Sequence, residues 1–387
     1  MKIVVTGGGS GGHITPVLAV AHELKQLQKD VEIIYIGQKG DGLADLPAAD
    51  KNIDRVCEVR AGKLRRYHGE GLRQLLDLKT MWLNIRDVFF VLAGLWQSFW
   101  FLRNERPDVI FIKGGFVGVP VGLSAALLRI PYITHDSDAL PGLANRIISP
   151  WARIHAVAMP KEIYSYPQEK TLTIGVPFSH VYHPFTADEV VAAREQIGVP
   201  TKGRLLLVTG GGLGAHRLNQ TVATCMQELL DRYPDLHVVH LAGRNHEAAL
   251  RQRYKSELKT VDQPRVIIKG FVTNLHTYSG AADVVITRAG ATSIAEFAGQ
   301  RKACIVVPNP ILAGGHQLKN AKVLADHAAV KLVSESKIKQ DDHALMPPLV
   351  ELLDNPKKAA DLGKKLGSFG DPDSAKRLAM LLLKEAA

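Results

Sequence analysis

The sequence predicts an α/β protein made of two doubly wound domains, each with a parallel sheet covered by helices. A chain of 387 residues is long enough for two such domains, at ~100–200 residues each. An apolar strand followed by a glycine-rich loop and a helical pattern opens the chain and recurs 203 positions later. Further apolar strands alternate with helical patterns in both halves. Such units predict two Rossmann-like doubly wound parallel-sheet domains facing a cleft.

The repeated unit can be followed in the letters. Residues 5–13 (VTGGGSGGH) correspond to residues 208–216 (VTGGGLGAH). Short apolar runs before these loops and helical patterns after them complete the two units. The predicted strands, in order, are 2–5, 31–36, 109–112, 132–134, 205–208, 237–241, 266–268, 284–286 and 304–307, and the predicted helices that follow the two loops are 16–27 and 218–230.

Domain boundaries follow from the same pattern. We expect an N-terminal domain over residues 1–176 and a C-terminal domain over residues 177–370, with the boundary at a Gly-Val-Pro turn. Residues 371–387 are predicted to be a terminal helix that could pack back on the N-terminal domain. The expected ligand site is the cleft between the two domains.

Composition narrows the class of protein and of partner. Hydrophobic residues make up 46% and charged residues 22%, which excludes a disordered chain and a polytopic membrane protein. The net charge of +10 favours an anionic partner, which could be nucleic acid, an acidic membrane surface or a phosphorylated small molecule. Cys57, Cys225 and Cys304 are too widely spaced for a disulfide framework or a CxxC metal site, so we expect a reducing cytoplasm. No signal peptide is expected, because the first apolar run is short.

Residues 88–102 form an uncharged apolar run of fifteen residues, shorter than the ~20 that a membrane-spanning helix needs. One interpretation is a buried core helix. The other includes the preceding segment, where basic side chains alternate with Leu, Met and Trp as on surfaces that bind anionic lipid. The residues predicted for this membrane patch are Arg65, Arg66, Leu75, Lys79, Met81 and Trp82.

The first glycine loop precedes a helix, so its backbone N–H groups and the helix N-terminus could bind a phosphate. Gly7, Gly9 and Gly12 match the G-x-G-x-x-G pattern of dinucleotide-binding domains. That pattern also needs an acidic residue at the end of the second strand, whereas Asp41 comes only later, in a loop. A nicotinamide enzyme is therefore disfavoured.

His13 follows the first loop directly, where an imidazole could act as a general base. Its counterpart His216 is interpreted as structural. Residues 113–120 (KGGFVGVP) form another glycine-rich turn and a possible second anion site. Residues 135–138 (HDSD) either cap a helix or reach into the cleft.

The segment 287–296 (TRAGATSIAE) follows a strand, and its glycine turn and helix start suit a diphosphate. Glu296 could accept two hydrogen bonds from ribose hydroxyls, or could serve only as a partner of the helix dipole. Residues 314–320 (GGHQLKN) carry polar groups suited to a sugar.

These motifs, in this order and spacing, resemble the MurG family of peptidoglycan glycosyltransferases. The resemblance covers residues 1 to about 330 and rests on TGGGSGGHITP, KGGFVGVP, HDSD with GLANR, VTGGGLGAHRLN, TRAGATSIAEFAG and HQLKNA. It implies the two-domain GT-B fold, UDP-N-acetylglucosamine (UDP-GlcNAc) as donor, and lipid I (undecaprenyl-diphospho-N-acetylmuramoyl-pentapeptide) as acceptor. It further implies inversion to a β-1,4 linkage, no cofactor and no metal, and attachment to the cytoplasmic side of the cell membrane as a peripheral protein.

The resemblance also implies roles for residues. His13 matches the general base that takes a proton from the muramoyl 4-hydroxyl. Positions matching donor contacts are Ser10, Gly11, Gly12, Asp138, Ser179, Gly212, Val272, Ala291, Thr292, Ser293, Ile294, Ala295, Glu296 and Gln317. Positions on the acceptor side are Gly9, Gly114, Gly115 and Asn145.

Three positions depart from the family pattern. Asp138 replaces an Asn, Ser179 replaces an Arg, and Gly212-Leu213 replace a Ser-Gln pair. Arg288 or His180 could compensate for the missing guanidinium. Alternative functions are another GT-B enzyme, such as a nucleotide-sugar 2-epimerase or a transferase to a different lipid, and an inactive homologue that recruits a partner to the membrane. Nucleic-acid binding is not expected, because no recognised motif accompanies the positive charge.

Overall fold

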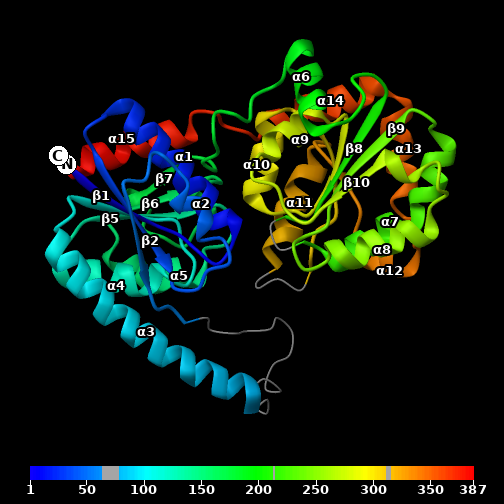
Figure 1. Ribbon diagram of the computed structural model, residues 1–387. Coiled ribbons are helices and arrows are strands. Elements are labelled where there is room, and N and C mark those ends of the chain that lie inside the picture. The colour runs from blue at the N-terminus through cyan, green and yellow to red at the C-terminus, as the bar shows by residue number, and fades with distance from the viewer. Residues whose placement is uncertain (63–77, 212–213, 311–314) are drawn as a thin grey trace. The chain divides into compact units, whose positions relative to one another are not determined.

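The computed structural model describes residues 1–62, 78–211, 214–310 and 315–387, without the side chains of residues 78–81 (Figure 1). The chain forms two compact units. The first contains Met1–His180, residues 315–316 and Asp371–Ala387, and the second contains Val181–Pro310 and Gln317–Gly370. The chain thus passes between units at residue 180, four residues beyond the predicted boundary.

The first unit is built on a seven-stranded sheet in the order β3-β2-β1-β4-β5-β6-β7, with every neighbouring pair parallel. Its strands are β1 Lys2–Thr6, β2 Glu32–Gln38, β3 Arg55–Val59, β4 Val109–Ile112, β5 Tyr132–Asp136, β6 Ile154–Val157 and β7 Thr171–Thr173. Its helices are α1 Gly11–Leu27, α2 Asp45–Ala48, α3 Leu78–Glu105, α4 Gly118–Leu128, α5 Leu143–Ile148 and α15 Ser374–Ala386.

Both faces of this sheet are covered, which explains why its central strands are continuous apolar runs. Ile3 and Val5 of β1 point to the face covered by α1 and α15. Val4 points to the opposite face, whose cluster includes side chains of α3, α4 and α5. The C-terminal helix α15 therefore completes the core of the first unit, and Figure 1 shows it beside α1.

The second unit has a six-stranded parallel sheet in the order β10-β9-β8-β11-β12-β13. Its strands are β8 Arg204–Thr209, β9 Leu236–Leu241, β10 Val266–Lys269, β11 Val284–Thr287, β12 Ala303–Val306 and β13 Lys331–Leu332. Its helices are α6 Ala187–Ile197, α7 His216–Arg232, α8 Glu247–Glu257, α9 Leu275–Ala281, α10 Ala291–Gly299, α11 His316–Asp326, α12 Glu335–Gln340, α13 Met346–Asp354 and α14 Pro356–Gly367. Apolar clusters fill both faces. The predicted fold class of two doubly wound parallel-sheet domains is confirmed.

The expectation that residues 88–102 form a buried core helix is wrong. They belong to α3, a helix of 28 residues with a row of exposed apolar side chains. Trp96 is 67% exposed and Phe89 is 65% exposed. The part Trp82–Glu105 is long and apolar enough to cross a membrane by length and composition. The opposite side of α3 packs on the unit, because a Cβ added to Gly94 would lie 1.9 Å from the Arg60 carbonyl oxygen.

Candidate active site

Each sheet has one point where the strand order reverses, and ligands of doubly wound folds bind at the carboxyl ends of the strands there. In the first unit this point lies between β1 and β4, and in the second it lies between β8 and β11. The described residues that leave these strands are 7–10 and 113–117 in the first unit, and 210–211, 214–215 and 288–290 in the second. The motifs selected from the sequence therefore gather at the carboxyl ends of the central strands, one group in each sheet. A cleft that both groups of motifs face stays a prediction.

His13 lies in the first turn of α1, which begins at Gly11, earlier than the predicted start at residue 16. The Ser10 hydroxyl lies 3.0 Å from Nδ1 of His13, and the His13 backbone N–H donates to the Ser10 carbonyl. Ser10 thereby fixes the orientation of the imidazole. If Nδ1 carries the proton and donates to Ser10, the Nε2 lone pair is left to accept a proton.

The environment of His13 disfavours the imidazolium. Loss of solvation, together with the nearby Lys113 ammonium, lowers the pKa of His13 to about 3. The side chain is partly buried. At neutral pH the imidazole is therefore unprotonated, the form that a general base needs.

The first glycine loop is closed by an acidic side chain. The Gly9 N–H donates to Oδ2 of Asp41 at 2.7 Å. Gly9 was expected to contact the acceptor substrate, but its backbone N–H is already hydrogen-bonded to a carboxylate of the same chain. Asp41 holds the loop rather than standing at the end of β2, the position from which a dinucleotide-binding domain holds ribose.

The loop after β4 packs directly on the first glycine loop. Gly115 has φ +81°, and a Cβ at this position would lie 2.6 Å from the Gly8 carbonyl oxygen. Only glycine allows this approach. The Cβ position of Gly114 lies 3.5 Å from Oδ1 of Asn145, so this loop lies between the first loop and α5.

Asp136 at the end of β5 organises the segment 135–145. Its Oδ1 accepts hydrogen bonds from the Gly142 N–H at 2.9 Å and from Nδ2 of Asn145 at 3.0 Å, and its Oδ2 accepts from the Tyr166 hydroxyl at 2.8 Å. Burial raises the pKa of Asp136, while these donors oppose the shift. Asn145 also donates to the His135 carbonyl. Asp138 contributes its carbonyl to the Tyr164 hydroxyl, so its backbone is held in place.

In the second unit, the glycine loop after β8 abuts the end of β9. A Cβ on Gly214, which has φ +73°, would lie 2.3 Å from the Ala242 carbonyl oxygen. Gly212 lies outside the described residues. Val272 packs partly buried against the core, and the neighbouring Phe271 ring lies 4.6 Å beneath the Arg244 guanidinium.

The helix α10 begins after Gly290 with no side-chain cap, so no capping side chain accepts a hydrogen bond from the N–H groups of its first turn. Ala291 and Ser293 are partly exposed, and Thr292 is buried. Ile294 and Ala295 point into the protein, so only their backbone could meet a ligand. Glu296 is 5% exposed, and its charge, after burial, raises the pKa of Tyr182.

Two further predicted donor positions have local structural roles. Gln317 is buried, and its Oε1 accepts the Asn309 N–H at 2.9 Å, which fixes the turn after β12. Ser179 is partly exposed, and its side chain lacks the positive charge of the Arg that it replaces. Arg288 donates to the Val307 carbonyl and to Glu335, which is also bonded by Arg217. Arg288 is thus held by the protein, which weakens the expectation that it compensates for Ser179.

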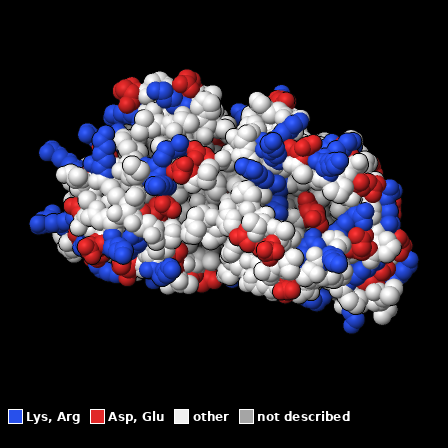
Figure 2. Space-filling model, turned by 90° about the horizontal axis from the view of Figure 1, so that it is seen from above, with Lys and Arg blue, Asp and Glu red and all other residues white. Residues whose placement is uncertain are grey.

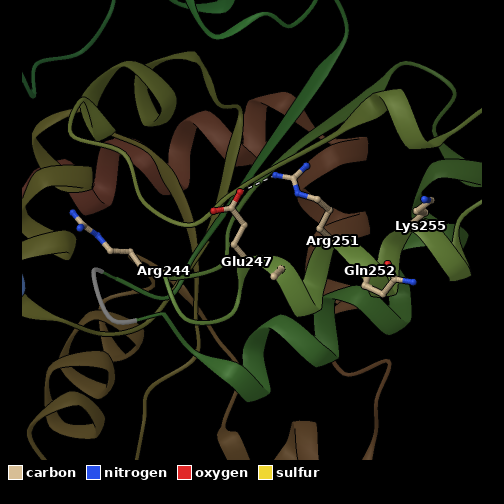
Figure 3. Close-up of a pocket in the computed structure, with 6 residues that line it drawn as sticks. Arg244, Glu247, Arg251, Gln252 and Lys255 are labelled. Carbon is tan, nitrogen blue, oxygen red and sulfur yellow. Dashed lines mark hydrogen bonds and ion pairs between the residues drawn. The ribbon is translucent and has the colours of Figure 1, made fainter.

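The polar hollow drawn in Figure 3 lies along α8. Arg251 points to Glu247 and pairs with it at 2.7 Å, and it also donates to the Ile268 carbonyl. Arg244 points away from this pair. The hollow is therefore a surface groove with an internal ion pair. The face seen in Figure 2 carries both signs of charge interspersed, without the single basic stripe that a nucleic-acid surface presents.

Three ligand-type side chains meet elsewhere in the described part of the first unit. Polar atoms of His22, Glu23 and His180 lie within 4.8 Å of one another. The two imidazole rings stack with centroids 4.5 Å apart and planes 25° apart. Lone pairs in nearly parallel ring planes do not converge on one point, so the arrangement suits ring stacking better than metal ligation.

Sequence reasoning missed several residues that build the site. Asp41, Tyr166 and Tyr182 are far in sequence from the motifs they support. A signal was present for Asp41, since it is an acid just beyond the second strand. The two tyrosines carry no local signal, because only the fold brings them to the motifs.

Comparisons with known proteins agree with this arrangement. Residues 3–157 match the "Glycosyltransferase family 28 N-terminal domain" and residues 205–378 match the "Glycosyltransferase family 28 C-terminal domain". The chain is 34% identical to a protein of Clostridium kluyveri, covering 79% of this chain and 78% of that protein. It is 30% identical to one of Carboxydothermus hydrogenoformans, covering 98% and 96%. Both are named "UDP-N-acetylglucosamine--N-acetylmuramyl-(pentapeptide) pyrophosphoryl-undecaprenol N-acetylglucosamine transferase".

Solved structures share the fold. The crystal structure of Acinetobacter baumannii MurG superposes with a TM-score of 0.68 at 24% identity, covering 99% of both chains. A UDP-GlcNAc 2-epimerase from Neisseria meningitidis superposes with a TM-score of 0.65 at 14% identity, covering 99% of this chain and 100% of that one. The fold alone therefore accommodates both transferases and epimerases, and the sequence relatives decide between them. On that ground the chain belongs to the MurG family of N-acetylglucosamine transferases, within glycosyltransferase family 28.

Proposed function

We propose that this protein transfers N-acetylglucosamine from UDP-GlcNAc to the muramoyl 4-hydroxyl of lipid I, inverting the anomeric carbon. The names of its relatives support the donor and a lipid-linked N-acetylmuramyl-pentapeptide acceptor. The observation that carries the proposal is His13, an unprotonated imidazole fixed by Ser10 beside the glycine loops of the first unit. A single base of this kind is what direct displacement requires.

In this mechanism Nε2 of His13 removes the proton from the acceptor hydroxyl as the oxygen attacks the anomeric carbon. An imidazole with a pKa near 3 is a weak base in the empty site. The negative charge of the acceptor diphosphate would offset the field of Lys113 and raise the pKa of His13 toward neutrality. Base strength thus increases when the acceptor binds.

The donor belongs to the second unit in this proposal. The uncapped start of α10 offers backbone N–H groups and the positive end of the helix dipole to the diphosphate of UDP-GlcNAc. Glu296 would accept hydrogen bonds from the ribose hydroxyls. Bonding of UDP as leaving group at α10 stabilises the charge that develops when the glycosidic bond breaks.

The protein would reach its lipid acceptor through α3, as a peripheral protein on the cytoplasmic side of the membrane. The exposed apolar side chains of this helix are Trp82, Ile85, Val88, Phe89, Phe90, Leu92, Trp96 and Trp100. Arg86 lies over the rings of Trp82 and Phe90, and Arg103 lies over Trp100. Interleaved aromatic and basic groups fit the interface of an anionic bilayer. Arg65, Arg66 and Leu75 lie outside the described residues, as do the side chains of Lys79 and Met81.

The test is transfer by the purified protein. With UDP-GlcNAc and a lipid I analogue, we expect UDP release together with a product heavier than the acceptor by one N-acetylhexosamine. His13→Ala should reduce the rate by ~10²–10⁴-fold, the usual contribution of a general base. His216→Ala, at the corresponding position of the second unit, is the matched control and should retain activity. Conversion of UDP-GlcNAc to an isomeric nucleotide sugar without acceptor would instead indicate an epimerase.

A further inference from the structure

Glu335 is a buried carboxylate that holds two arginines. It is the first residue of α12 and is 7% exposed. Its Oε2 accepts a hydrogen bond from Nη1 of Arg288, and its Oε1 accepts one from Nη1 of Arg217 at 3.2 Å. The Arg288 guanidinium, which is buried too, also donates to the Val307 carbonyl at 3.0 Å. One carboxylate thus connects three other positions of the second unit.

The four connected positions lie at the carboxyl ends of four adjacent strands. The strands β8, β11, β12 and β13 are neighbours in the six-stranded sheet. Arg217 lies in the first turn of α7, the helix after β8, and Arg288 directly follows β11. Val307 directly follows β12, and Glu335 lies beyond β13. Because doubly wound folds bind ligands at this end of the sheet, Glu335 joins the turns beside the expected ligand.

Stability alone does not account for this arrangement. Desolvation of a carboxylate and a guanidinium offsets most of their attraction, so a buried ion pair is a weak source of folding free energy. The bonds do restrict position. Arg288 lies two residues before Gly290, after which α10 begins. Val307 lies two residues before Asn309, whose N–H is bonded to Gln317. The bonds of Glu335 therefore hold the base of both turns to which donor contacts are assigned.

We infer that Glu335 is a positioning residue for the donor, which holds the Arg288 guanidinium and thereby fixes the start of α10 for the diphosphate. This inference rests on the proposed function for the identity of the donor. Glu335 itself touches no substrate. Hydrogen-bond donors that are already in place lose no free energy to reorganisation when the diphosphate binds and leaves. The cluster also keeps a net positive charge, since two guanidinium groups share one carboxylate.

The first arm of the test uses Glu335→Gln, which keeps the shape of the side chain and removes its charge. Calorimetry should show UDP binding weakened ~10-fold, because the start of α10 is no longer held. KM for UDP-GlcNAc should rise by a similar factor, while KM for the lipid I analogue stays within twofold. Unchanged UDP affinity, or an equal rise in both KM values, would overturn the inference.

The matched control for this arm is Glu351→Gln. Glu351 also bridges two cations of the second unit, Lys331 at 2.8 Å and Lys358 at 3.7 Å. It lies on α13 and is partly exposed. Its variant should bind UDP like the wild type. A loss of UDP affinity equal to that of Glu335→Gln would mean that any broken ion pair of the unit has this effect, and the specific role of Glu335 would fail.

The second arm separates positioning from stability by adding Arg288→Met, alone and together with Glu335→Gln. The single Glu335→Gln should lower the melting temperature by ~2–8 °C, because Arg288 loses its buried counter-charge. The double variant should regain this loss, since no unpaired charge is left at position 288. It remains a usable protein even if Glu335→Gln alone does not fold.

The affinity of the double variant for UDP decides the inference. If Glu335 acts through Arg288, the double variant should bind UDP as weakly as Arg288→Met alone. Affinity that recovers together with the melting temperature would mean that Glu335 only stabilises the fold. Losses that multiply would mean that the two residues act separately. A wild type that binds UDP but transfers no sugar contradicts the proposed transfer and leaves this test intact, whereas a wild type that binds no UDP contradicts both.

Discussion

His13 shows how much of the chemistry depends on the surroundings of one side chain. The sequence places it after a glycine loop, but its proton affinity is set by burial and by Lys113, a residue 100 positions away. Ser10 then selects which ring nitrogen faces outward. The same imidazole on an open surface would be half protonated near pH 6.5.

The lowered pKa of His13 predicts an unusual pH profile. Because kcat/KM reports the free enzyme, kcat/KM for the acceptor should stay level from pH 8 down to pH 5. The acidic limb of kcat should lie at higher pH than that of kcat/KM, since bound acceptor adds negative charge. Folding also favours the neutral form of His13, because its pKa is lower in the folded protein than in the unfolded chain. The contribution of His13 to stability is therefore complete above pH 6.5 and is lost as pH falls toward 3.

This prediction is checked by steady-state rates over pH 5–8 in buffers of constant ionic strength. An acidic limb of kcat/KM centred at pH 6.5 would mean that His13 behaves as an ordinary exposed imidazole. Lys113→Met should move the limb upward, because it removes a positive charge that opposes protonation.

At the scale of elements, α3 combines two surfaces. One side packs closely, as Gly94 against the Arg60 carbonyl shows, and Ser124 of α4 donates to the Leu95 carbonyl. The other side exposes a stripe of aromatic and aliphatic residues. Exposed apolar patches of this extent mark interaction surfaces.

The α3 stripe predicts binding to anionic vesicles. Phe89→Ser with Trp96→Ser should weaken binding at least ~10-fold, because each side chain contributes ~1.5–3 kcal/mol when buried. Flotation with vesicles of phosphatidylglycerol and phosphatidylcholine measures this directly. Val261→Ser, which alters a residue 77% exposed in the second unit, is the control and should float like the wild type. Equal flotation of the double variant would show that α3 is not the contact surface.

The elements also show where sequence patterns fail. The central strands were located within one or two residues, because burial on both faces makes them continuous apolar runs. The missed strands were β3, β6, β7 and β13. All four lie at or next to a sheet edge, and β13 has only two residues. Short strands with exposed positions carry little periodicity, so pattern alone cannot separate them from loops.

At the scale of the whole molecule, the last helix returns to the first unit. Leu378 and Leu382 of α15 are fully buried in the cluster that also holds Ile3 and Val5. Ser374 donates to the Val176 carbonyl at 2.8 Å. The first unit is therefore incomplete without the C-terminal seventeen residues of the chain.

Because α15 packs into the core of the first unit, we expect substitution of its buried residues, but not of its exposed ones, to lower stability. Leu382→Ala should lower the free energy of unfolding by about 2–5 kcal/mol, the usual cost of a buried leucine. Met380→Ala, two residues away and 54% exposed, should change it by less than about 0.5 kcal/mol. Urea unfolding followed by circular dichroism provides the comparison. Similar midpoints for the two variants would mean that α15 contributes little to the core of the first unit.

The sequence by itself determined the fold class, the repeated glycine loops and the family, because these depend on local apolar runs, local turns and ordered motifs. Tertiary structure alone decided that Asp41 closes the first loop and that Asp136 accepts three hydrogen bonds from distant groups. It also exposed one face of α3 and placed α15 on α1. The physical reason is that hydrogen bonding, desolvation and burial depend on groups distant in sequence, which only the packed chain brings together.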